Sequence, residues 1–166
     1  MNLGRFRVGL RVDDVIRAAD FYRGLGFTDV GSVSGLDEVP VMVMLQRDGA
    51  MLIVDALVGM PFAPTPREAM IQAGPRGLGV AIGLGVDDLE AVYRWCREAG
   101  CEITAEPRDE PYGDRVFECI DPFGYLWEIS QPMSDVPTNE AVAAAHDSWY
   151  GAEQVGPGID LVENLG

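Results

Sequence analysis

The chain has 166 residues, 48% of them hydrophobic, and its 27 acidic and 12 basic residues give a net charge of −15 at pH 7. This length and apolar content suffice for a folded domain, and no apolar run approaches the roughly 20 residues of a membrane span. The negative charge argues against nucleic acids and anionic membranes as partners, because both need a basic surface.

Few side chains are available for metal or covalent chemistry. Every basic residue is an arginine, which excludes chemistry through a lysine amine, and one histidine cannot build a multi-histidine site within one chain. Cys96, Cys101 and Cys119 lack the spacing of a zinc motif and are interpreted as small core residues in a reducing compartment. Since no signal-peptide pattern is found, we expect a cytoplasmic protein.

The first module, residues 1–56, begins with a strand and a helix. Residues 7–12 alternate between apolar and polar or small side chains, which predicts a strand with one buried face. Asp13 or Asp14 can cap the following helix, which Gly26 is placed to end. Three further strands are expected near residues 27–33, 39–46 and 50–56.

The second module, residues 79–131, repeats the first at an offset of 74 residues. Between residues 9–26 and 83–100, 7 of 18 positions are identical, where composition alone gives roughly one or two. Its later strands are expected near 101–107, 114–120 and 124–131. The linker, residues 57–78, can form a short helix over 67–73, and an acidic helix and tail, residues 132–166, end what we expect to be one structural domain.

Three motifs carry a resemblance to a known family: Phe21–Phe27 (FYRGLGF), Tyr112–Arg115 (YGDR) and Asp121–Tyr125 (DPFGY). In this order, within a duplicated module, they resemble the vicinal oxygen chelate superfamily of glyoxalases, bleomycin resistance proteins and extradiol dioxygenases. The resemblance covers about residues 5–131. It implies an α+β fold in which two tandem βαβββ modules form a curved mixed sheet around a cleft.

The resemblance also implies where metal ligands, usually His, Glu or Gln, would lie on the first and last strand of each module. The matching positions are Arg7, Val54, Ala81 and Glu128, and the offset of 74 pairs them. Only Glu128 is a possible ligand, because arginine stays protonated while valine and alanine carry no donor atom. We therefore expect no metal site and no cofactor, and Glu128 is the only catalytic candidate.

Glu128 leaves three interpretations open. It can form an ion pair with Arg7 across the cleft, both side chains can be solvated, or Glu128 can act as a metal-free general base. Whether the chain catalyses a reaction therefore stays open.

The residues expected to bind a ligand lie on the first strands, on the last strand of the second module and in one loop. Glycines there leave space, although close strand packing explains them equally well, and Arg11 offers a planar fork for a carboxylate or an aromatic ring. Tyr112 and Arg115 come from a loop that can line the opening or serve only as a turn. The full set is Arg7, Gly9, Arg11, Gly83, Gly85, Tyr112, Arg115 and Glu128.

These expectations favour metal-independent binding or sequestration of a small molecule, of the antibiotic-resistance type, by a homodimer. The alternative is a glyoxalase-like lyase or isomerase, or a dioxygenase, with an atypical site. Arg7 and Arg11 make the inner cleft locally basic, which suits an anionic ligand. We expect no nucleic acid and no membrane as partner.

Overall fold

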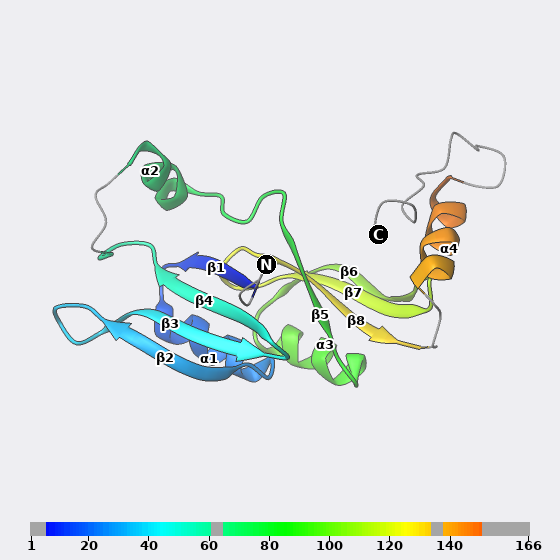
Figure 1. Cartoon of the computed structure of the whole chain (residues 1–166), viewed down its shortest axis with the longest axis horizontal. Coiled ribbons are helices and arrows are strands. Elements are labelled where there is room, and N and C mark those ends of the chain that lie inside the picture. The colour runs from blue at the N-terminus through cyan, green and yellow to red at the C-terminus, as the bar shows by residue number, and fades with distance from the viewer. Residues whose placement is uncertain (1–5, 61–64, 134–137, 151–166) are drawn as a thin grey trace, which may run out of the picture. The chain divides into compact units, whose positions relative to one another are not determined.

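The chain divides into two compact units in a computed structural model that describes residues 6–60, 65–133 and 138–150 (Figure 1). Unit 1 comprises residues 1–80 and 122–125, and unit 2 comprises residues 81–121 and 126–166. Each unit holds one four-stranded mixed sheet with a helix between its first two strands. The predicted α+β fold of tandem βαβββ modules is thus confirmed. Among the described residues, no helix is long and apolar enough to span a membrane.

Unit 1 is built on sheet A, in which β1 runs parallel to β4 while β3 runs antiparallel to both β4 and β2. The strand order is β1-β4-β3-β2. Asp14 caps α1 as expected, because its Oδ1 accepts a hydrogen bond of 2.9 Å from the backbone N–H of Arg17. The elements are β1 (Arg7–Val12), α1 (Val15–Gly24), β2 (Thr28–Ser34), β3 (Pro40–Arg47), β4 (Ala50–Ala56) and α2 (Pro66–Ala73).

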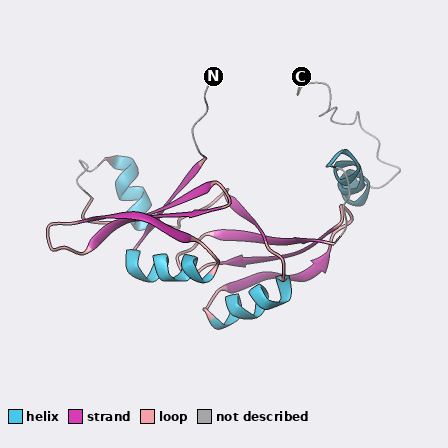
Figure 2. Cartoon of the chain, turned by 60° about the horizontal axis from the view of Figure 1, so that its bottom comes forward, coloured by secondary structure: helices cyan, strands magenta, loops and turns pink. Residues whose placement is uncertain are grey.

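One face of sheet A is buried under α1 (Figure 2). The side chains on that face are apolar and almost fully buried: Leu10, Val12, Val43, Leu45, Leu52 and Val54. Side chains alternate along a strand, so the neighbouring residues point to the other side. We call this side the open face of sheet A, and its residues are Arg7, Gly9, Arg11, Met42, Met44, Met51, Ile53 and Asp55. Helix α2 lies on this side.

The turn at residues 122–125 belongs to unit 1 and completes its core. Phe123 is 2% exposed, and its ring lies 5.9 Å from that of Phe21 and 6.0 Å from that of Tyr22, measured between centroids. The Tyr125 hydroxyl accepts a 2.8 Å hydrogen bond from the Arg11 backbone N–H and donates a 2.9 Å bond to the Arg11 carbonyl. Because β1 is an edge strand, this hydroxyl satisfies two backbone groups that a further strand would otherwise pair.

Unit 2 is built on sheet B, with the strand order β5-β8-β7-β6. Trp127 is 1% exposed on the side of α3, and its Nε1–H donates to Asp121 Oδ2 over 2.8 Å, which places this side chain in the core of unit 2. The elements are β5 (Ala81–Gly85), α3 (Leu89–Glu98), β6 (Glu102–Asp109), β7 (Asp114–Ile120), β8 (Leu126–Pro132) and α4 (Thr138–Tyr150). Helix α4 is the helix expected within residues 132–166, and the tail beyond it, residues 151–166, lies outside the described residues.

The last strands of the two modules correspond at an offset of 75 residues rather than 74. Gly9 pairs with Ile53 in sheet A, and Gly83 pairs with Glu128 in sheet B, so the counterpart of Glu128 is Ile53 (128 − 53 = 75). The assignment of Val54 to this position was wrong, because Val54 is fully buried on the side of α1. A slip of one residue moves a side chain to the opposite face of a sheet.

The extra residue lies in the turn of the second module. Gln46 pairs with Met51 across four intervening residues in sheet A, whereas Ile120 pairs with Leu126 across five in sheet B. The longer turn is the segment that inserts Phe123 into the core of unit 1. The sequence repeat therefore holds as far as β7 and shifts by one residue at β8.

Candidate functional site

The centre of the open face of sheet A is apolar and partly exposed. Met42 and Met44 of β3 lie beside Met51 and Ile53 of β4 on this face. A glycine on the neighbouring edge strand, Gly9, leaves room, because a Cβ there would meet only Asp55 Oδ2 at 3.8 Å. Methionine side chains adapt to irregular partners, so this surface suits an apolar body of variable shape.

One end of the open face carries charge. Arg11 and Asp55 are register partners on the parallel strands β1 and β4. Arg11 forms an ion pair with Glu68 of α2, and the two side chains are 17% and 23% exposed. Arg11 Nε and Asp55 Oδ1 are buried without a hydrogen-bond partner among the described residues. Buried polar atoms of this kind are uncommon and point to an additional partner.

The Asp55 carboxyl is electrostatically perturbed. Burial raises its pKa above the ordinary value, and the nearby Arg11 offsets only part of that rise. Asp55 therefore keeps a proton at higher pH than a solvated aspartate. The pair offers a cationic fork beside a carboxyl that can donate or accept a hydrogen bond.

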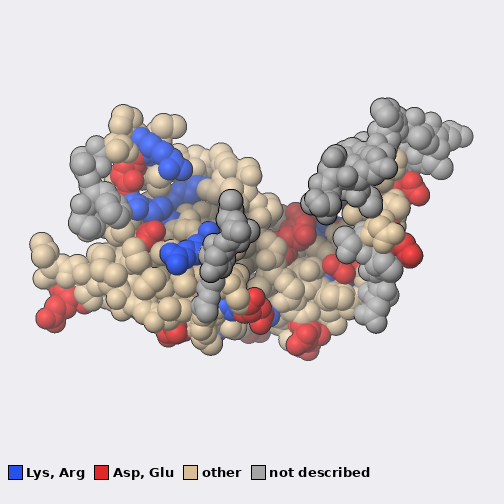
Figure 3. Space-filling view, in the orientation of Figure 1, with Lys and Arg blue, Asp and Glu red and all other residues tan. Residues whose placement is uncertain are grey.

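Helix α2 is attached to this charged end through polar contacts. Besides the Glu68 pair with Arg11, Gln72 Nε2 donates to the Leu57 carbonyl over 3.1 Å. No side chain of α2 is buried. Figure 3 shows basic side chains gathered over α2 and the neighbouring part of unit 1, although the whole chain is acidic. The surface next to Arg11 is therefore locally positive.

The structure brings three predicted residues together in unit 1. Arg7, Gly9 and Arg11 share the open face of sheet A, as the alternation in β1 predicted. Asp55 and Glu68 were missed. Asp55 is the only polar residue of β4, and its position could have fixed which side of that strand is open.

Predicted residues in unit 2 share the face of sheet B opposite α3. Gly83 pairs with Glu128, which is exposed and faces its cross-strand neighbour Glu118. Tyr112 lies close enough to this face for the Glu128 carboxylate to act on it electrostatically. Burial raises the pKa of Tyr112, and the carboxylates of Glu110 and Glu128 raise it further. Gly85 occupies the same face two residues beyond Gly83. This surface is acidic, in contrast with that of sheet A.

Arg115 lies apart from the other predicted residues. Its partner across the β7–β8 ladder is Gln131, whose side chain accepts a hydrogen bond from the first residue of α3. The guanidinium is held by Glu90 at 3.1 Å and Asp109 at 2.7 Å. This position ties β7 to α3. Arg7 belongs to unit 1 and Glu128 to unit 2, and their ion pair stays a prediction.

Two surface grooves in unit 1 lie away from this constellation. One, of about 400 Å³, runs beside α1, where Arg23 is already paired with Asp20 and Asp29. The other, of about 420 Å³, surrounds the turn between β3 and β4. Neither groove is lined by a residue with a buried polar atom that lacks a partner within the part of the chain that the structure describes, whereas Arg11 and Asp55 at the polar end of the open face both have one.

Comparison with known proteins assigns the family. The profile of the Glyoxalase/Bleomycin resistance protein/Dioxygenase superfamily matches residues 4–129. The chain belongs to this superfamily. An uncharacterized protein of Mycobacterium tuberculosis (strain H37Rv) is 29% identical to it over 143 residues, which are 86% of this chain and 82% of the relative.

Two solved structures share the fold. TioX from Micromonospora sp. ML1 superposes with a TM-score of 0.59 at 23% identity, covering 78% of this chain and 99% of TioX. A glyoxalase family protein from Bacillus cereus gives a TM-score of 0.61 at 16% identity, covering 81% of this chain and 97% of that protein. At these identities the likeness concerns the fold alone.

Proposed function

We propose that this superfamily member binds and sequesters a small molecule with an apolar, aromatic body and an acidic group. The body lies on the methionine-rich open face of sheet A, and Arg11 binds the acidic group. The observation that carries the proposal is the ion pair between Arg11 and Glu68, beside buried polar atoms of Arg11 and Asp55 that lack partners among the described residues. Arginine pairs well with planar acidic groups.

In this account Glu68 acts as an internal competitor for the ligand. A carboxylate from α2 occupies Arg11 while the surface is free. Because α2 buries no side chain, moving it away disrupts little packing. An incoming acidic group would take over the pairing with Arg11, and the protonated form of Asp55 could donate a further hydrogen bond to it.

We propose that binding needs no metal ion. Of the positions matched to the superfamily's metal ligands, Arg7 stays protonated and cannot coordinate a cation, Ala81 carries no ligand atom, and Ile53, which replaces Val54 in the comparison, carries none either. One carboxylate, Glu128, is a weak basis for holding a divalent ion against water.

Two matched fluorescent probes test the proposal. Anilinonaphthalene sulfonate and N-phenylnaphthylamine share an aromatic body, and only the first carries a negative charge. Arg11→Ala should weaken binding of the sulfonate about tenfold, the equivalent of one charge-assisted hydrogen bond. Glu68→Gln should tighten binding of the sulfonate, since it removes the competitor. Neither change should alter binding of the neutral probe by as much.

Glu128→Gln is the matched control, because it removes a carboxylate from the open side of sheet B. It should leave both affinities unchanged. The proposal is wrong if the Arg11 and Glu68 variants shift both probes equally, or if Glu128→Gln alone abolishes binding.

A catalytic function, as a glyoxalase-like lyase or isomerase, is the second candidate. It is favoured by one observation, the raised pKa of Asp55, which suits proton transfer better than an ordinary aspartate does. For any compound that the protein turns over, Asp55→Asn should abolish turnover while the compound still binds. Unchanged turnover in that variant would remove Asp55 from a catalytic role.

A further inference from the structure

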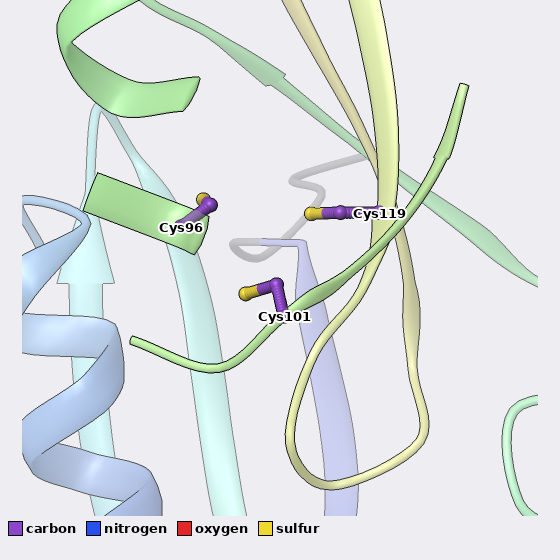
Figure 4. Close-up of side chains that lie close together, drawn as sticks. All are labelled: Cys96, Cys101 and Cys119. Carbon is purple, nitrogen blue, oxygen red and sulfur yellow. The ribbon is translucent and has the colours of Figure 1, made fainter. Parts of the chain in front are cut away.

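Three cysteines converge in unit 2 although they are distant in sequence. Cys96 comes from α3, Cys101 follows that helix, and Cys119 comes from β7 (Figure 4). Their Sγ atoms all lie within 4.8 Å of one another. Cys96 and Cys119 are buried, and Cys101 is partly exposed. The cluster therefore consists of two buried thiols and one thiol that solvent can reach.

We propose that these three thiols bind one thiophilic divalent metal ion of the zinc and cadmium class. Sulfur ligands at about 2.3 Å from zinc in a tetrahedral site lie about 3.8 Å apart, so only a small closure of the cluster is needed. Three ligands leave a fourth position for a solvent molecule or another group. This site is separate from the ligand-binding surface proposed for sheet A and independent of that function.

Charge balance favours a divalent ion over a monovalent one. On binding, three S–H bonds break, three metal–sulfur bonds form and three protons pass to solvent, without oxidation or reduction. Three thiolates leave a net charge of about −1 with a divalent ion and about −2 with a monovalent ion. The Asp121 carboxylate is 3% exposed and acts electrostatically on Cys101 and Cys119. A smaller negative charge is easier to bury beside it.

The surroundings argue against a redox-sensing role for the same thiols. Oxidation proceeds through the thiolate and needs exposure, and two of these thiols are buried. A bound cation supplies the charge that stabilises thiolates in such a place. Binding should therefore strengthen as the pH rises.

A cadmium titration tests the site. Full-length protein, reduced and stripped of metal, is titrated with Cd²⁺ while sulfur-to-cadmium charge-transfer absorption is followed in the ultraviolet. We expect absorption to saturate at one ion per chain, Cd²⁺ to displace Zn²⁺ that is bound beforehand, and about three protons to be released per ion. Absence of the absorption at stoichiometric Cd²⁺ in the wild-type protein would overturn the proposal.

Two variants sharpen this test. Cys101→Ser, at the most accessible ligand, should weaken Cd²⁺ binding roughly 100-fold, at least as much as loss of a supporting partner does in known metal sites. Glu128→Gln should bind as the wild-type protein does, with both variants folded by circular dichroism. Wild-type affinity in Cys101→Ser, or loss of the absorption in Glu128→Gln, would place the metal elsewhere and refute the assignment.

Discussion

The open faces of sheets A and B share a backbone arrangement and differ in chemistry. Both first strands place a glycine, Gly9 or Gly83, opposite the middle of the last strand. In unit 1 this glycine is flanked on its face by Arg7 and Arg11, whereas the flanking residues in unit 2 are Ala81 and Gly85. The repeat therefore preserves a glycine at the centre of both open faces, and only the first copy places cationic side chains beside that glycine.

The helix-covered faces differ in a similar way. In unit 1 the space beside α1 is filled by aromatic rings, among them Phe123 from the turn between β7 and β8. In unit 2 the space beside α3 holds Trp127, Phe117 and three thiols. Both copies thus bury aromatic side chains beside the helix, and the second copy also contains groups that can bind an ion. Four substitutions in unit 1 test this comparison, and they follow in order of decreasing effect.

Phe123→Ala should produce the largest loss of stability. Removing a buried aromatic ring that contacts Phe21 and Tyr22 should lower the free energy of unfolding by about 3–4 kcal/mol. Urea denaturation measures the change. Phe6→Ala is the control, because Phe6 is 72% exposed and should contribute little. Similar losses in both variants would contradict the role given to the turn.

Gly77→Ala should be more harmful than Gly79→Ala. Both glycines have a positive φ, +73° and +79°, so alanine strains the backbone at either position by about 1 kcal/mol. At Gly77 alone the new Cβ would lie 2.9 Å from Tyr125 Cδ1 and 3.0 Å from the Gly124 carbonyl oxygen. We expect about 1–2 kcal/mol of additional loss there. Equal melting temperatures would show that the turn does not pack as described.

Tyr125→Phe tests the hydroxyl at the edge of β1. The variant leaves the Arg11 N–H and carbonyl without their shared partner, which should lower the free energy of unfolding by about 1–2 kcal/mol. Tyr93→Phe is the matched control in unit 2, where an exposed hydroxyl pairs with Glu106. That control should change stability by less than half as much in the same denaturation assay.

Asp55→Asn should have the smallest effect, with a sign that depends on pH. Because its pKa is raised in the folded state, the folded protein holds this proton more tightly than the unfolded chain does. Aspartate at this position therefore lowers stability as the pH rises from 3.8 through the raised pKa. The variant should be more stable at neutral pH by a few tenths of a kcal/mol, since the group is partly solvated.

Thermal unfolding at several pH values measures this difference. The gain should vanish below the ordinary pKa of aspartate, where both states are protonated. A variant less stable than wild type at neutral pH would mean that Arg11 stabilises the Asp55 charge more than burial disfavours it.

The fold could be predicted because its signals are local and repeated. Alternation in β1, acidic caps at Asp14 and Asp88, and the glycine ends of both helices recur at one offset. The phase of β4 could not be predicted from that offset, because Met51 to Val54 are all apolar and give no alternation. Because the turn of the second module holds one additional residue, the offset of 74 assigned Val54 to the open face, where the structure places Ile53.

The candidate site could not be predicted from the sequence, because it depends on contacts between segments that are distant in sequence. Glu68 reaches Arg11 from a helix beyond the strands, and nothing in the spacing of the two indicates that pairing. The cysteines were missed for the same reason, since intervals of five and 18 residues match no metal motif, and only the packing of α3 against β7 brings their sulfurs together.

Methionine methyl groups give the most direct test of ligand binding on sheet A. Protein labelled with carbon-13 at these methyls is titrated with anilinonaphthalene sulfonate, and the resonances are assigned by single substitutions. We expect shifts at Met42, Met44 and Met51, on the open face of sheet A, and none at Met133, which is 59% exposed at the end of sheet B. Shifts at Met133 while those three resonances stay unchanged would contradict this expectation.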